Sequence, residues 1–161
     1  MKFLIAIILI LLILFFQIGL SPYLGIFGAH PNLILVSLLS LTILIGIRRS
    51  LIWIILVGVF LDFYTLNNFL GVSAASLIAS ACTIFFLSQN LFKKTNFVSI
   101  IILFLAAIAV YYLFLFGFNT AFGSRPEFKL ITLLFNVFYN IIFAIPVFYL
   151  VKTYVNKFIK V

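Results

Sequence analysis

Side chains that could do chemistry are scarce in this chain. It has 161 residues, and its only acidic residues are Asp62 and Glu127, with one histidine, His30, and one cysteine, Cys82. Two carboxylates and one imidazole are too few for a metal site built from side chains. They are also thin material for general acid–base catalysis, and a lone cysteine cannot form a disulfide within the chain. The inventory therefore argues against an enzyme and predicts no cofactor.

Asp62 stands out because it lies inside the apolar stretch GVFLDFY, residues 58–64. An acid near the membrane centre costs about 2.5–3.5 kcal/mol on insertion scales, so it must face protein or water. Counted from Leu51 at the helical rise, Asp62 lies about 16 Å into the membrane, near its midplane. Gly58, four residues earlier, shares the same helix face and would let a neighbouring helix approach the carboxylate.

Amide side chains are expected at a similar depth. Asn136 and Asn140 are four residues apart on one face of the last expected helix, and Asn140 lies about 15 Å from its start at Leu130. Gln17, on the first expected helix, lies further toward the outside. The sequence therefore predicts a polar cluster in the outer half of the molecule, with Asp62 at its floor. Its expected members are Gly58, Asp62, Gln17, Asn136 and Asn140, with Arg125 and Glu127 in an outer loop.

Two interpretations of Asp62 remain open. A buried carboxyl could fix helix packing by hydrogen bonding to an amide or a backbone group. Alternatively, it could form a solute or proton site, or anchor a partner protein, since intramembrane acids are functional candidates by default. A proton-driven transporter usually needs a relay, whereas Asp62 is the one acid expected at depth. Structural pinning or partner anchoring is therefore the preferred hypothesis.

The elements that position these residues are predicted to be membrane helices. The chain is 67% hydrophobic and 7% charged, whereas soluble domains are nearer half apolar and a quarter charged. A spanning helix takes about 20 apolar residues, and the sequence predicts one all-α domain, residues 1–161, folded as a bundle of six such helices. Their expected ranges are 3–20, 31–47, 51–65, 70–92, 97–118 and 130–151.

The net charge of +8 is better explained by membrane topology than by nucleic-acid binding, because the cations lie between or beyond the apolar stretches. Arg125 and Lys129 fall at the ends on one side, and the other eight cations at the ends on the opposite side. Because positive residues collect in the cytoplasm, an even number of helices places both termini there. The eight cations are Lys2, Arg48, Arg49, Lys93, Lys94, Lys152, Lys157 and Lys160.

The fourth expected helix carries small residues at helical spacing. Gly71, Ala75 and Ala79 recur every four residues, and Ser76 and Ser80 lie beside them. Such a face lets another helix approach closely, and hydroxyls can bond across the contact. Packing within the bundle is preferred over a docking face for a partner's helix, because this spacing is common in membrane bundles.

Together these features resemble the MreD family, the small membrane subunit of the bacterial cell-elongation (rod-shape) machinery. The resemblance covers nearly the whole chain and rests on the order of several short marks. They are Pro31-Asn32-Leu33, Gly58 and Asp62 as Gly-x-x-x-Asp, Leu70-Gly71, Arg125-Pro126-Glu127, Asn136 and Pro146.

The resemblance implies a non-enzymatic role in the bacterial cytoplasmic membrane, with the single-span protein MreC as partner. It further implies action with the glycosyltransferase RodA and a class B penicillin-binding protein in peptidoglycan synthesis, guided by MreB filaments. MreD-like folds are also similar to the substrate-binding subunits of energy-coupling factor transporters. A vitamin-binding subunit of that kind is therefore the alternative, although the first helix has only Ala6 where those subunits present Ala-x-x-x-Ala.

Overall fold

The computed structural model describes residues 12–19, 23, 25, 29–64, 70–90, 96–121 and 130–158. Its elements in these ranges are all helices, which confirms the all-α prediction for this part of the chain. A helical stretch at 12–19 precedes the labelled helices. These are α2 (Leu33–Ile45), α3 (Ile47–Tyr64), α4 (Val72–Asn90), α5 (Phe97–Ala121) and α6 (Leu130–Phe158).

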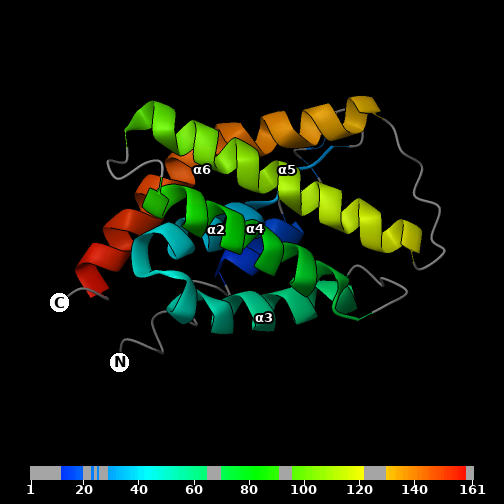
Figure 1. Ribbon diagram of the computed structural model, residues 1–161, viewed down its shortest axis with the longest axis horizontal. Coiled ribbons are helices and arrows are strands. Elements are labelled where there is room, and N and C mark those ends of the chain that lie inside the picture. Colours follow the sequence, from blue (N-terminus) through cyan, green and yellow to red (C-terminus); the bar gives the residue numbers. More distant parts are fainter. Residues whose placement is uncertain are drawn as a thin grey trace.

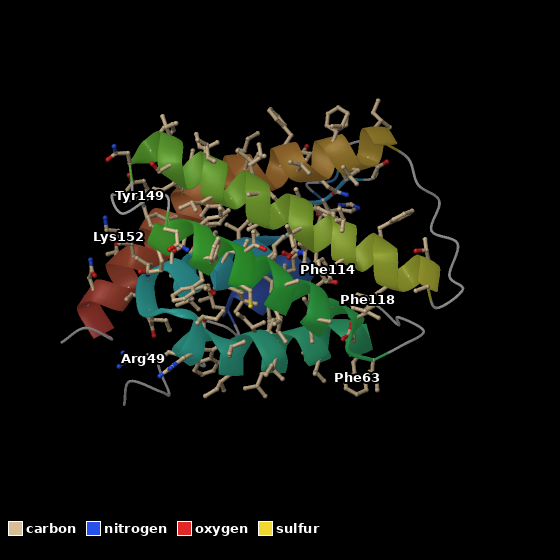
Figure 2. The ribbon with its side chains drawn as sticks, viewed as in Figure 1. Arg49, Phe63, Phe114, Phe118, Tyr149 and Lys152 are labelled. Carbon is tan, nitrogen blue, oxygen red and sulfur yellow. The ribbon has the colours of Figure 1, made fainter. Side chains whose placement is uncertain are left out.

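Within the described ranges, three segments are long and apolar enough to cross a membrane: Val72–Asn90, Phe97–Ala121 and Ile131–Lys157. Large apolar side chains also project outward from α3, α5 and α6, among them Phe63 and Phe114 (Figure 2). In water such an exposed apolar surface marks an interaction site or an aggregation risk, whereas lipid tails are as apolar as these side chains. The described helices are therefore compatible with a helical membrane protein.

The helices alternate in direction along the chain. In Figure 1, α2, α4 and α6 run from right to left, and α3 and α5 run from left to right. Helix α4 packs against α5, α3 and α2, while α2 also packs against α6. Within α2, every residue from Ile34 to Thr42 is buried. A helix that is apolar all round belongs inside a structure, and α2 accordingly forms the centre of this one.

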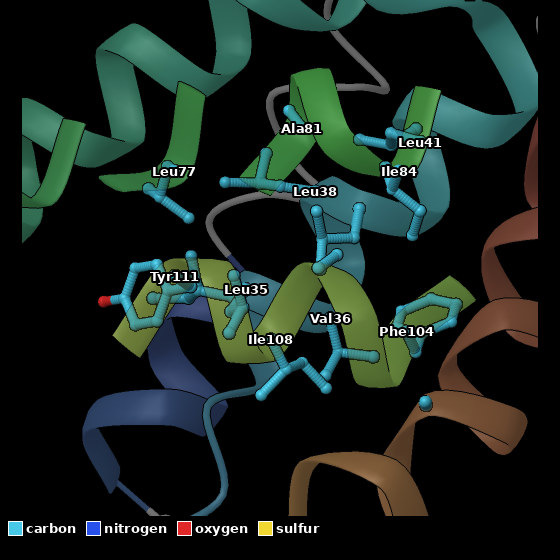
Figure 3. Close-up of a cluster of buried hydrophobic side chains, with 14 of the residues drawn as sticks. Leu35, Val36, Leu38, Leu41, Leu77, Ala81, Ile84, Phe104, Ile108 and Tyr111 are labelled. Carbon is cyan, nitrogen blue, oxygen red and sulfur yellow. The ribbon is translucent and has the colours of Figure 1, made fainter. Parts of the chain in front are cut away.

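The core lies where α2 meets its neighbours. Figure 3 shows Leu35 and Leu38 of α2 beside Leu77 of α4 and Ile108 of α5, all of them buried. Helix α6 joins through the Phe148 ring, which meets Phe104 of α5 edge to face with 6.5 Å between ring centroids. Because polar backbone groups are paired within the helices, this core is held by close packing of apolar side chains.

A single residue separates α2 from α3. Gly46 has φ +84° and ψ 160°, a combination that is essentially restricted to glycine. Its N–H donates to the Thr42 carbonyl at 3.1 Å, and its carbonyl accepts from the Ser50 N–H at 3.2 Å. The hydroxyls of Thr42 and Ser50 also pair, at 3.1 Å. The turn is therefore fixed from both sides.

This turn moves the start of the third helix. The sequence suggested that one helix stops at Arg48 and Arg49 and that the next begins near Leu51. The chain instead turns at Gly46, and both arginines lie exposed in the first turn of α3. Local backbone conformation, rather than charge, sets this boundary.

Helices α5 and α6 are longer than expected. Helix α5 continues to Ala121 instead of residue 118, and α6 continues to Phe158 instead of residue 151. Pro146 lies inside α6, where it has no N–H to donate to the preceding turn. Figure 1 shows the C-terminal part of α6 (red) running in a different direction from its N-terminal part (orange), as expected for a proline kink.

Candidate functional site

Asp62 caps a helix to which it does not belong. It lies in the last turn of α3, and its side chain is 1% exposed. Its Oδ2 accepts a hydrogen bond from the Gly71 N–H at 2.8 Å, and its Oδ1 accepts one from the Ser73 N–H at 2.8 Å. These N–H groups belong to the start of α4, where the backbone lacks partners within the helix. A carboxylate at the positive end of a helix is also electrostatically favourable.

Local sequence explains why α4 needs an external cap. Gly71 immediately precedes the helix, with φ +99°, and has no side chain that could cap it. Its carbonyl accepts the Ala75 N–H at 2.8 Å and so closes the first turn. The N–H groups of Gly71 and Ser73, at the same end of the helix, donate to Asp62 instead. The end of α3 and the start of α4 are thus joined by one carboxylate.

Gly58 allows α3 and α4 to come this close. A Cβ atom placed on Gly58 would lie 2.5 Å from Cα and 2.8 Å from Cβ of Ala74. Real Cβ atoms essentially never make contacts that short, so only glycine fits without movement. The sequence predicted that Gly58 would admit a neighbouring helix, and the structure shows that this helix is α4.

A second set of contacts surrounds the start of α2. Gln17 donates through Nε2 to the Pro31 carbonyl at 3.1 Å and accepts through Oε1 from the Leu33 N–H at 2.7 Å. One side-chain amide thereby pairs with two backbone groups two residues apart. Backbone at this position needs such partners, because a non-helical chain within a membrane protein must be satisfied by protein or by water.

Helix α6 supplies the other two amides. Asn140 is fully buried, and its Oδ1 accepts the Asn32 N–H at 2.8 Å. Its Nδ2 donates to the Tyr112 hydroxyl at 3.1 Å and to the Asn136 carbonyl at 2.8 Å. Asn136 in turn accepts the His30 N–H through Oδ1 at 3.0 Å. Asn140 therefore ties the start of α2 to both α5 and α6.

Asn32 connects the two sets of contacts. Its side chain accepts the Leu35 N–H at 2.9 Å and so forms the N-cap of α2. The Tyr111 hydroxyl of α5 hydrogen-bonds to the Asn32 side chain, and Tyr111 also lies near Asp62. Tyr111 therefore lies between the N-cap of α2 and the carboxylate that caps α4.

The prediction of a polar cluster is thus met in part. Gln17, Asn136 and Asn140 do converge, but on the backbone of residues 30–33 rather than on Asp62. Asp62 lies in the last turn of its helix, not in the middle of a span, and it holds α4. The other two expected members, Arg125 and Glu127, lie outside the described residues.

Three contributors were not predicted as members of the polar cluster: Asn32, Tyr111 and Tyr112. Asn32 had a signal, because an asparagine directly before an apolar run is a typical N-cap. The sequence suggested instead that Pro31 opens the helix, whereas α2 begins two residues later. The tyrosines had no such signal, since their partners lie on other helices.

The serines of α4 do not bond across the helix contact. Ser76 and Ser80 are fully buried, but their hydroxyls donate to the carbonyls of Val72 at 2.8 Å and Leu77 at 2.9 Å, within the same helix. The small-residue face is only partly buried, whereas Ala74 and Ala81 lie on the buried side. The burial of Ser76 and Ser80 is therefore explained by packing inside the bundle. The members of the partly buried face are Gly71, Ala75 and Ala79.

Two cavities adjoin these contacts, and both have apolar walls. One, of about 370 Å³, lies between α5 and α6 beside Tyr112 and Val137. The other, of about 200 Å³, lies between the helical stretch at 12–19, α2 and α6, beside Phe16 and Leu33. Within the part of the chain that the structure describes, no three His, Cys, Asp or Glu side chains gather as metal ligands would. The polar side chains of this site, Asp62, Gln17 and Asn140, hydrogen-bond to backbone groups of the protein.

Comparison with known proteins identified no relative: no family model, no curated protein and no solved structure matches the chain. The interpretation of the site therefore rests on its own geometry and on the sequence marks described above.

Proposed function

We propose that this chain is a six-span, non-catalytic subunit of the bacterial cell-elongation machinery, similar to MreD. In this proposal it lies in the cytoplasmic membrane with both termini in the cytoplasm. It binds MreC and helps RodA and its class B penicillin-binding protein to act on the wall under the guidance of MreB. The proposed activity is that of a scaffold that presents membrane helices to its partners.

One observation carries the proposal: buried and partly buried polar side chains bind the ends of helices. Asp62 caps α4, and Asn140 and Gln17 hold the start of α2. Polar groups are costly in a membrane and are usually retained for function or for fixed geometry. Here they are hydrogen-bonded to backbone groups of the protein itself. This supports a rigid bundle that would bind its partners through its outer faces.

Several of the sequence marks of the resemblance lie at these joints. Asn32 is the N-cap of α2, Gly58 is the contact with α4, and Asp62 and Gly71 form the α3–α4 joint. Asn136 holds the backbone of His30. Proteins that share a scaffold would need the same residues at the contacts that fix the helices. The position of these residues therefore supports a likeness to MreD over an unrelated six-helix protein.

The orientation is supported by the described cations. Arg48 and Arg49 begin α3, and Lys152 and Lys157 lie near the end of α6. Since α3 and α6 run in opposite directions, these four residues share one end of the bundle. The positive-inside rule assigns that end to the cytoplasm.

A vitamin-binding subunit remains the second candidate because of the cavity between α5 and α6. Its volume of about 370 Å³ falls in the range of small-molecule pockets, about 300–1,000 Å³. Such pockets also need a few well-placed polar groups, and the hydroxyl of Tyr112 is engaged with Asn140. The cavity therefore favours an apolar occupant.

Co-purification tests the proposal. The full chain is isolated from its host membranes in mild detergent, and bound proteins and small molecules are identified by mass spectrometry. The scaffold proposal predicts the single-span partner and components of the wall-synthesis machinery. A stoichiometric vitamin together with an ATPase-coupled transporter would overturn it in favour of the second candidate.

A further inference from the structure

One end of the bundle carries several positively charged side chains. Asn32 and Asn140 are hydrogen-bonded to each other, and α2 and α6 run in the same direction from that point. Ile45, the last residue of α2, is then about 20 Å from this level, and Lys152 lies on α6 beyond the kink at Pro146. The turn at Gly46 follows directly. Arg48 and Arg49, in the first turn of α3, therefore lie toward the same end of the bundle as Lys152.

The two arginines occupy an electrostatically unfavourable place. They are exposed in the first turn of α3, which contains no acidic residue. A helix N-terminus carries partial positive charge and favours anions, so cations there repel it. Among the described residues the one carboxylate is Asp62, which lies at the other end of α3. An anion from outside the chain would relieve this repulsion.

Lys152 adds a further positive charge on α6 at this end of the bundle. Its Nζ lies 5.9 Å from the centre of the Tyr149 ring, within the distance of a cation–π contact. Figure 2 shows Arg49 at the start of α3 and Lys152 on α6 at the same end of the bundle, with Phe63 at the far end of α3. We call Arg48, Arg49 and Lys152 the basic end.

We propose that the basic end selectively binds the phosphate headgroups of anionic phospholipids in the surrounding leaflet. Guanidinium groups bind phosphate in a bidentate manner, and juxtamembrane cations are attracted to anionic lipid surfaces. Phospholipid is the favoured occupant because the cations flank apolar helix faces that lipid tails would cover. Exposed Ile52 and Leu56 follow directly on α3. The inference rests on the membrane insertion stated in the proposed function, but not on the cell-elongation role.

The chain contains its own reporter for this binding. Trp53 is its one tryptophan and lies four residues after Arg49, hence on the same face of α3. The purified full chain is reconstituted into phosphatidylcholine vesicles containing a fixed fraction of phosphatidylglycerol. Bromine, which quenches tryptophan fluorescence on contact, is placed on the acyl chains of either lipid in turn.

The expected result is stronger quenching of Trp53 by brominated phosphatidylglycerol than by equally dilute brominated phosphatidylcholine. The local enrichment should be about fivefold for each engaged cation. Arg48→Gln combined with Arg49→Gln should remove most of the preference, and Arg48→Lys with Arg49→Lys should retain part of it. Equal quenching by both lipids in the unmodified chain would overturn the inference whether or not the variants fold.

Two further outcomes separate the sources of phosphate and the residues involved. If phosphatidylglycerol shows no preference over phosphatidylcholine, while inorganic phosphate changes Trp53 fluorescence more than sodium chloride at equal ionic strength, the site binds free phosphate and the lipid assignment is wrong. A preference that survives in the double Gln variant, when that variant reconstitutes normally, would also contradict the assignment to the arginines. The measurement uses purified protein, so its failure would leave the cell-elongation proposal standing.

Discussion

The carboxylate of Asp62 accepts the backbone N–H of Ser73 at 2.8 Å, across eleven residues of chain and from one helix to the next. Its other oxygen accepts the Gly71 N–H at the same distance. One side chain at the end of α3 thus completes the start of α4. This relationship explains an acid in an apolar sequence without assigning it a solute or a proton pathway.

The loss of stability on replacing Asp62 should depend on how many hydrogen-bond acceptors the new side chain keeps. Asp62→Asn keeps one oxygen for two N–H groups and should lower the free energy of unfolding by about 1–2 kcal/mol. Asp62→Leu keeps none and should cost about 1–3 kcal/mol more, because both N–H groups lose their partner in a buried site. Thermal unfolding in detergent measures the difference. Equal stability of the two variants would contradict the capping role.

The sequence could predict Asp62 as important but not its partner. Capping residues are usually recognised next to the helix they cap, and Gly71 at that position has no side chain. The cap comes from the preceding helix, so no local pattern in α4 indicates it. By contrast, Gly58 was correctly predicted as a point of close approach, because helical spacing alone places it on the face of Asp62.

The long apolar helices could also be predicted from local features of the sequence. Helices α4, α5 and α6 correspond to long, predominantly apolar stretches, and length and composition suffice to recognise them. The turn at Gly46 was not, because charge at Arg48 and Arg49 was a more conspicuous signal than one glycine. The amides on α6 were recognised as a pair, but only the fold reveals that they bind the backbone at the start of α2.

Gly58→Ala should disturb the α3–α4 contact. The new methyl group would lie within 2.8 Å of both Cα and Cβ of Ala74, so the helices must separate, at a cost of about 1–3 kcal/mol. Gly117→Ala is the matched control, because a Cβ there meets nothing within 4 Å. It should be neutral or stabilising by up to about 1 kcal/mol. Comparable destabilisation of both variants, by the same unfolding assay, would show that the contact is not responsible.

Asn140→Leu should loosen the start of α2. It removes the acceptor of the Asn32 N–H and the donor to Tyr112, with an expected cost of about 1–3 kcal/mol. Asn136→Leu should cost less, because its bond to the His30 N–H is exposed and water can replace it. Hydrogen exchange of residues 30–35 should accelerate strongly in the first variant and weakly in the second. The reverse order would contradict the assignment.

Gly46→Ala tests backbone strain separately from steric contact. A Cβ on Gly46 has open space around it, yet φ is +84°. The expected loss is therefore conformational, about 1–3 kcal/mol. If Gly46→Ala is as stable as the unmodified chain, the α2–α3 turn does not require glycine.

Depletion of the protein in its host tests the proposed function most directly. Cells are imaged while the chain is removed, sites of new wall synthesis are labelled, and vitamin uptake is measured in the same culture. The scaffold account predicts loss of rod shape and dispersed wall synthesis with uptake unchanged, restored by the unmodified chain and less fully by Asp62→Leu than by Asp62→Asn. Normal rods with normal wall growth after depletion would contradict it.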